Sequence, residues 1–227
     1  VSKVGIYTAP SVEPVFSGPK AMVKRVQEAV SSVAVPGRIV GLIGGEHSIS
    51  VGSVRIMREL YPDLSVLYLD AHADLRDKYL GTRWGHASVA RRLFDICPIV
   101  QIGVRSLSNL EHNFVSRQSL PVIYWPPDSI DLAKICSDVE GSLSKNVYIS
   151  IDLDVFDPSV IAAVGNPEPG GMTWADVTGL LRQIAFNHEI VGFDITELSP
   201  QEGPEASAYT ASKLVYKLIG YATENKS

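Results

Sequence analysis

The sequence has few of the features that mark secreted, membrane or nucleic-acid-binding proteins. It contains only two cysteines, Cys97 and Cys136, in separate apolar contexts that match neither a disulfide framework nor a CxxC zinc pattern. We therefore expect both to be reduced core residues. No apolar run approaches the roughly 20 residues that a membrane span needs, and the N-terminus lacks the n-region and h-region of a signal peptide. These absences predict a cytoplasmic protein that does not enter a membrane.

Basic residues do not gather anywhere along the chain. The formal net charge is −5, whereas a nucleic-acid-binding surface needs a patch of lysine and arginine. We therefore expect no nucleic-acid partner, and we interpret Lys24–Arg25 and Arg91–Arg92 as solvated helix faces. A GxGxxG pattern is also missing after the first expected strand, which disfavours a dinucleotide-binding domain.

Short β-branched runs alternate with longer amphipathic stretches. Most of the short runs are nearly continuous in apolar residues, as expected of parallel strands covered on both faces. We expect strands at Lys3–Tyr7, Arg38–Ile43, Ser65–Leu69, Ile99–Val104, Val122–Trp125, Val147–Ile151 and Ile190–Asp194. We expect helices at Gly18–Ser32, Ser48–Leu60, His86–Phe94, Asp131–Leu143, Thr173–Asn187 and Ala206–Thr223. The alternation predicts an α/β fold, a three-layer α/β/α sandwich with a mostly parallel central sheet, formed by residues 1–227 as a single domain.

Acidic residues and histidines follow four of these strands directly. Gly44–Ser48 follows the second strand, Asp70–Asp74 the third and Asp152–Asp157 the sixth, while Glu197 comes just after the seventh. Ligands of open α/β sheets gather at the carboxyl ends of the strands. We therefore expect these groups to meet at one rim of the sheet.

The segments DAHAD at 70–74 and SIDLD at 150–154 concentrate the carboxylates. Residues two apart in a strand point the same way, so the acids within each segment can converge. Four carboxylates packed together are too costly unless cations neutralise them, and two divalent metals would do so. The candidate ligands are His47, Asp70, His72, Asp74, Asp152 and Asp154.

These candidates also have structural interpretations. His47 follows a Gly-Gly turn, so it could be a histidine at a helix start that Ser48 caps. Asp152 and Asp154 could be turn-forming or capping aspartates, as we expect for Asp157. A ligand set of imidazoles and carboxylates without thiolate suits manganese or another hard divalent ion better than a structural zinc. Shared carboxylates could hold two such ions about 3.5–4 Å apart.

Two further side chains near this rim could act on a substrate. Glu197 could be a solvated loop glutamate, but beside a metal pair it is better explained as an anchor for a planar cationic group. His86 could be a simple helix-start histidine. Twelve residues past Asp74, on a loop that leaves the same rim, it is also well placed to shuttle protons. We expect His112 and His188 to be surface residues.

Six motifs resemble, in the same order, those of the ureohydrolase family, which includes arginases, agmatinases and guanidino-acid hydrolases. They are GGEHS at 44–48, DAHAD at 70–74, GHAS at 85–88, SIDLDVFDP at 150–158, GNPEPGG at 165–171 and DITELSP at 194–200. The chain departs from the family pattern at Val164-Gly-Asn, where Gly-Thr-Gly-Thr is usual, and its N-terminal segment is short for the family.

The resemblance implies a dimanganese centre that hydrolyses a guanidino group to urea and an amine. By position, one Mn²⁺ would be held by His47, Asp70, Asp74 and Asp152, and the other by His72, Asp70, Asp152 and Asp154. His86 matches the family's mobile catalytic histidine and Glu197 its guanidinium-binding glutamate, while Asp74 could also pass on a proton. The resemblance further implies a homo-oligomer, a trimer or a hexamer.

The segment Leu75–Trp84 bears on the substrate. Arginase-like enzymes carry an Asn and a Ser-Gly-Asn run there, whereas this chain has Arg76 and no such run, and resembles archaeal and thermophile agmatinases. We therefore expect a small cationic guanidino substrate, agmatine or aminopropylagmatine, which gives putrescine or spermidine; Asp77 could pair a distal ammonium. The alternatives are an arginase or guanidino-acid hydrolase, a mononuclear zinc deacylase, or a metal-holding homologue without chemistry.

Overall fold

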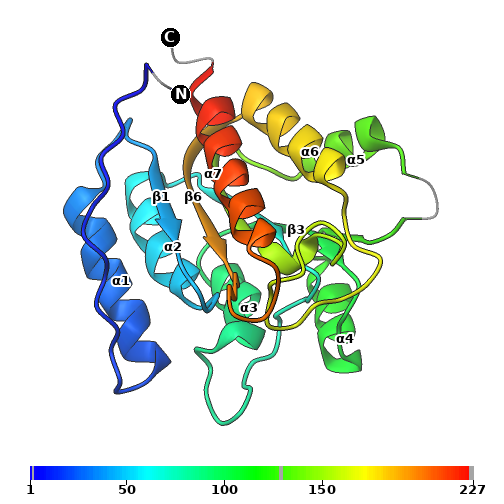
Figure 1. Ribbon diagram of the computed structural model, residues 1–227. Coiled ribbons are helices and arrows are strands. Elements are labelled where there is room, and N and C mark those ends of the chain that lie inside the picture. The colour runs from blue at the N-terminus through cyan, green and yellow to red at the C-terminus, as the bar shows by residue number, and fades with distance from the viewer. Residues whose placement is uncertain (2, 128–129, 225–227) are drawn as a thin grey trace.

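Six parallel strands form one central sheet in the order β1-β6-β5-β2-β3-β4 (Figure 1). The structure is a computed structural model, and it describes residues 1, 3–127 and 130–224. The strands are β1 (Val40–Ile43), β2 (Ser65–Leu69), β3 (Ile99–Val104), β4 (Val122–Tyr124), β5 (Asn146–Asp152) and β6 (Glu189–Thr196). Every residue of β2 and β3 is buried, which explains why their sequences are apolar without alternation.

Helices cover both faces of the sheet, and each face has its own apolar core. One face packs against α1 (Pro19–Val33), α2 (Ile49–Leu60), α3 (Val89–Phe94) and α4 (Asn109–Gln118). The other packs against α5 (Leu132–Glu140), α6 (Trp174–Asn187) and α7 (Ala206–Glu224). This is the predicted three-layer α/β/α sandwich. Both cores share the one sheet.

Two helices begin with reciprocal capping interactions. Thr173 Oγ1 accepts from the backbone N–H of Asp176, whose carboxylate accepts from the N–H of Thr173, which forms a capping box at the start of α6. Ser108 and Glu111 form the same box at the start of α4. The sequence analysis missed α4 because its residues are mostly polar, and only one turn of it faces the core.

The structure corrects two predictions from the sequence. Lys3–Tyr7 is not a strand, and the side chain of Tyr7 is 78% exposed. An apolar run becomes a strand only where a neighbouring strand completes its hydrogen bonds, which sequence alone does not reveal. Arg91–Arg92 is not a solvated face either. Arg92 is buried and donates to Asp77, and the Arg91 guanidinium lies 3.9 Å from the centroid of the Phe114 ring.

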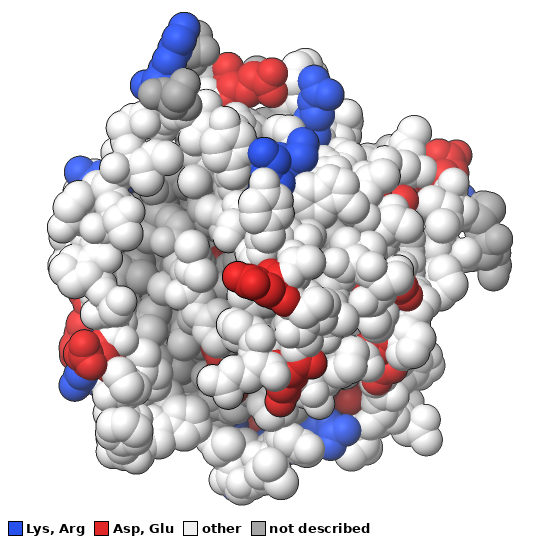
Figure 2. Space-filling view, in the orientation of Figure 1, with Lys and Arg blue, Asp and Glu red and all other residues white. Residues whose placement is uncertain are grey.

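The prediction for the two cysteines is confirmed. Cys97 and Cys136 are free and buried. On the face shown in Figure 2, lysines and arginines are scattered among acidic side chains rather than gathered into a basic patch. None of the helices in the described part of the chain combines the length and the apolar character needed to cross a bilayer.

Candidate metal centre

The register of the sheet brings the candidate ligands to one rim. Leu69 pairs with Ile151, so the residues that follow them, Asp70 and Asp152, leave neighbouring strands side by side. Asp152 is in turn paired with Thr196, which precedes Glu197. His47 lies in the turn between β1 and α2, and β1 is the strand beside β6. The four strand ends therefore meet as the sequence predicted.

Two groups of side chains at this rim could each hold a metal ion. In the first, His47 Nδ1 lies 3.4 Å from Asp70 Oδ2 and 3.3 Å from Asp152 Oδ2. In the second, His72 Nδ1 lies 2.8 Å from Asp154 Oδ2 and 3.5 Å from Asp70 Oδ1. Asp70 belongs to both groups and turns one oxygen toward each. This is the arrangement expected of a carboxylate shared between two cations.

Asp74 lies beside the first group rather than within it. Its Oδ2 is 3.9 Å from His47 Nδ1 and accepts a hydrogen bond of 2.8 Å from the hydroxyl of Tyr68. Asp74 and Glu197 also have left-handed backbone, with φ of 50° and 64°, which is uncommon for residues with a side chain. Strain of this kind persists where surrounding structure holds a functional geometry in place.

The buried carboxylates of the cluster need cations to balance their charge. Burial, followed by repulsion from neighbouring carboxylates, raises the pKa of Asp74, Asp152 and Asp154. Burial alone would lower the pKa of His72, but hydrogen bonds to Asp154 and Asp70 raise it to about 11. Asp70 Oδ2 is fully buried and has no hydrogen-bond partner among the described residues. The protein side chains thus compete for too few positive charges, so the donor set fits a pair of divalent cations.

The turn before α2 holds two carboxylates with its backbone. Glu197 Oε1 accepts a 2.7 Å hydrogen bond from the N–H of His47, and Glu46 accepts from the N–H and the hydroxyl of Ser48. Ser48 does stand at the N-cap position of α2, but its side chain makes no capping bond and donates to Glu46 instead. Burial raises the pKa of Glu197.

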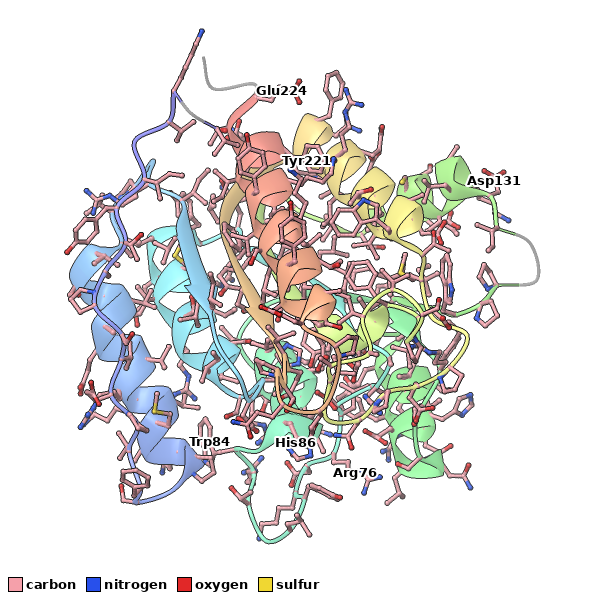
Figure 3. All side chains as sticks on the ribbon, viewed as in Figure 1. Arg76, Trp84, His86, Asp131, Tyr221 and Glu224 are labelled. Carbon is pink, nitrogen blue, oxygen red and sulfur yellow. The ribbon has the colours of Figure 1, made fainter. Side chains whose placement is uncertain are left out.

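A pocket of about 320 Å³ opens over the cluster, a volume suited to a small ligand. His86 reaches it from the loop after β2, and its Nδ1 lies 3.7 Å from Glu46 Oε1. Figure 3 shows His86, Trp84 and Arg76 together at one end of the molecule, with Tyr221 and Glu224 at the opposite end. The side chains that line the pocket include His72, Asp74, Arg76, Tyr79, His86, Ser108, Asp152, Asp154, Asn166 and Glu197.

Several side chains that support the site were missed in the sequence analysis. Arg105 donates to the carbonyl oxygens of Asp154 and Glu168, at 2.8 and 2.7 Å, and so ties the loop at 165–171 to the cluster. Tyr68 and Ser150 are buried against His47. Both stand two residues before an aspartate on the same strand face. A polar residue inside an apolar strand, two positions before a candidate ligand, could have indicated these supporting roles from the sequence.

Comparison with known proteins agrees with this geometry. The model of a family described as the arginase family matches residues 1–220. The chain belongs to the arginase family. Among its arginase-family relatives, the N(1)-aminopropylagmatine ureohydrolase of Synechocystis sp. is 34% identical, over 98% of this chain and 75% of the relative. The agmatinase of Pyrococcus horikoshii is 36% identical, over 78% of this chain and 61% of the relative.

A solved structure gives the same arginase-family fold. The crystal structure of the agmatine ureohydrolase of Thermoplasma volcanium superposes with a TM-score of 0.81 at 34% identity. The match covers 90% of this chain and 69% of that one.

Proposed function

We propose that the protein is a binuclear manganese ureohydrolase that hydrolyses the guanidino group of agmatine or aminopropylagmatine. One observation carries the proposal. Two His/Asp groups share Asp70, and their members His72, Asp152 and Asp154 line the same pocket as Glu197 and His86. A mononuclear zinc site would not need this number of carboxylates, so the arrangement disfavours the deacylase alternative.

Six side chains would hold the two metals. One Mn²⁺ would be bound by His47, Asp70, Asp74 and Asp152, and the other by Asp70, His72, Asp152 and Asp154. Carboxylate oxygens with two imidazoles suit Mn²⁺. When bound, a metal pair supplies Lewis acidity and makes water a nucleophile at neutral pH.

The protein's own residues would bind the substrate and move protons. Glu197, fixed by its bond from the His47 N–H, would pair with the planar guanidinium over the cluster. Water adds to the guanidinium carbon, and the bond from that carbon to the alkyl-substituted nitrogen then breaks. The water oxygen becomes the urea oxygen. Asp74 would take one proton from the water and pass it to the alkyl-substituted nitrogen, so that the C–N bond can break. The remaining hydroxyl proton is lost to solvent as the urea carbonyl forms. His86 would deliver one proton from solvent to the departing amine, which leaves as an alkylammonium.

The charges around the pocket favour a cationic substrate tail. Glu46 lies beside His86, and Glu168 Oε1 lies 3.7 Å from His72 Nε2, so acids flank both sides of the cluster. Asp77, which we considered as an ammonium partner, instead accepts hydrogen bonds of 2.7 Å from Arg83 and 2.9 Å from Arg92. Two arginines already neutralise it, so Asp77 is a poor anchor for the tail.

A guanidino acid is the second candidate substrate, because Arg76 also lines the pocket. Its guanidinium stacks on the Tyr79 ring, 4.9 Å from the centroid, and could receive a carboxylate tail. Glu111, 3.8 Å away, opposes this charge. We therefore rank the guanidino acid below agmatine.

The test is urea release by the manganese-loaded protein from agmatine, aminopropylagmatine, arginine and guanidinobutyrate in parallel. We expect urea from the first two. Release from guanidinobutyrate alone would favour the role of Arg76 as a carboxylate anchor. No urea from any of them, with two metals bound, would contradict the proposed reaction.

Three further expectations belong to the same proposal. We expect a homo-oligomer, a trimer or hexamer, a cytoplasmic location and a role in polyamine biosynthesis. Light scattering of the purified protein tests the first, and a monomeric mass would contradict it.

A further inference from the structure

A hydrogen-bonded chain lies behind His47, on the side of the ring that faces away from the metal centre. His47 Nε2 is 2.9 Å from Ser150 Oγ, and Ser150 Oγ donates to Asp194 Oδ1 at 2.8 Å. All three side chains are buried, with exposures of 3% or less. The proposed mechanism uses only His47 among them. Ser150 and Asp194 therefore need a separate explanation.

The sheet register builds this chain. Ser150 on β5 pairs with Tyr68 on β2 and with Asp194 on β6, so the three side chains form a row across adjacent strands. His47 lies over the row, with its ring stacked on Tyr68 at a centroid distance of 4.9 Å. The ring thus has a flat neighbour on one face and a hydrogen-bond partner at Nε2, which together limit how it can turn.

The direction of the hydrogen bonds fixes the role of His47 Nε2. A hydroxyl has one proton, and Ser150 gives it to Asp194, so Ser150 Oγ can only accept from Nε2–H. When the ring is neutral and held in this way, its lone pair is at Nδ1, the atom that faces Asp70 and Asp152 at 3.4 and 3.3 Å and the Tyr68 hydroxyl at 3.1 Å. Metal binding by histidine needs this neutral form with its lone pair aimed at the cation.

We infer that Ser150 and Asp194 are positioning residues for the first metal site: they hold His47 as the tautomer that presents its Nδ1 lone pair to the cation. The inference rests on the proposed metal centre and goes beyond it. It also gives a role to Asp194, a buried carboxylate that would otherwise be costly in the centre of the sheet.

The inference predicts that the two metal sites respond differently. Only the first site contains His47, whereas the second is built around His72. Loss of the hydrogen bonds behind His47 should therefore weaken the binding of one ion and leave the binding of the other unchanged. A general loosening of the fold would weaken both.

The experiment is Mn²⁺ titration calorimetry of the full chain and of the variants Ser150→Ala and Asp194→Asn. Ser65→Ala is the matched control, because Ser65 is also a buried strand serine whose hydroxyl is hydrogen-bonded, but at the far end of β2. We expect one of the two sites to weaken by about 10- to 100-fold in Ser150→Ala, and by less in Asp194→Asn, which keeps an acceptor oxygen. Ser65→Ala should bind as the wild type does.

Each outcome has a distinct meaning. Selective weakening of one site in both variants supports the inference. Wild-type affinities in either variant, or equal weakening of both sites, would overturn it. If the wild-type protein itself bound no Mn²⁺, the proposed function would fail instead, so the two failures are distinguishable. Asp194→Asn, which changes no side-chain volume, keeps the test available should Ser150→Ala not fold.

Discussion

Tyr68 contacts two candidate metal ligands with different parts of its side chain. Its ring stacks on His47, and its hydroxyl donates to Asp74. Burial, followed by the charge of Asp74, raises the pKa of Tyr68 well above its usual range, so the hydroxyl keeps its proton. Tyr68 therefore acts as a fixed hydrogen-bond donor rather than as a base.

Replacing Tyr68 by Phe tests this role. The ring stack remains, but a buried Asp74 oxygen loses its donor. Because hydrogen bonds to charged groups contribute about 1.5–3 kcal/mol, we expect the free energy of unfolding of the metal-free protein to fall by about that amount. Denaturant unfolding in the presence of a chelator measures it. Tyr61→Phe is the control, since the Tyr61 hydroxyl accepts from the exposed Gly37 N–H. Equal stability of Tyr68→Phe and wild type would contradict the role.

The pairing of His86 with Glu46 makes a prediction about pH. The hydrogen bond to Glu46 is the largest cause of a raised pKa of His86, so the protonated imidazole persists to higher pH than in an unpaired histidine. Activity that needs protonated His86 should be present below this pKa and fall as pH rises through it. In Glu46→Gln the falling limb should move to lower pH.

The pH profile of kcat for wild type and Glu46→Gln measures this shift. Glu59→Gln is the control, since Glu59 is an exposed acid on α2 away from the pocket. A falling limb at the same pH in all three proteins would rule out Glu46 as the cause.

Strand β3 passes so close to the metal centre that only glycine fits at one position. Gly103 has φ of 101°, and a Cβ there would lie 2.5 Å from Val155 Cγ2 and 2.9 Å from the Asp70 carbonyl oxygen. Two residues later, Arg105 ties the same strand to the carbonyls of Asp154 and Glu168. β3 and the residue that follows it therefore contact the backbone beside Asp70 and Asp154, although β3 contributes no candidate ligand.

Gly103→Ala should accordingly be costly. Left-handed strain and a backbone clash together predict a loss of roughly 2–4 kcal/mol in unfolding free energy. Gly141→Ala is the matched control, because Gly141 is right-handed with φ of −60° and its added Cβ would meet its nearest neighbour at 3.5 Å. We expect that variant to stay within about 1 kcal/mol of wild type. Denaturant unfolding of wild type and the two variants measures these free energies. Similar unfolding free energies for Gly103→Ala and Gly141→Ala would contradict the close approach of Gly103 to Val155 and Asp70.

The whole molecule should be stabilised by metal, because the ligands come from three strand ends that meet only in the folded chain. Each ion, at a free concentration a hundred times its dissociation constant, adds about 2.7 kcal/mol to the free energy of unfolding. For a chain of this size we expect the melting temperature to rise by about 5–10 °C per ion with Mn²⁺.

Thermal unfolding with Mn²⁺ and with chelator measures this stabilisation. Asp70→Asn should abolish it, since Asp70 belongs to both metal groups. Asp138→Asn, an exposed acid on α5, should keep it. A full manganese shift in Asp70→Asn would contradict the shared-ligand arrangement.

The sequence by itself determined the layer architecture and the rim where the candidate ligands lie. Buried parallel strands are continuous apolar runs such as Ser65–Leu69, and their two-residue period puts Asp70 and His72, or Asp152 and Asp154, at the strand ends. Both patterns lie within a single segment, so they can be recognised without knowing which other strands lie beside it. The family motifs add residue roles to this frame, and six of the predicted side chains line one pocket.

Only the tertiary structure decided how these residues are supported. The register between β2, β5 and β6 aligns Tyr68, Ser150 and Asp194 behind His47, and no feature of any single strand encodes that alignment. The same holds for the failed strand at Lys3–Tyr7. The physical reason is common to all of them. A hydrogen-bond partner or a pairing strand comes from a distant part of the chain, and its position is fixed only when the layers pack.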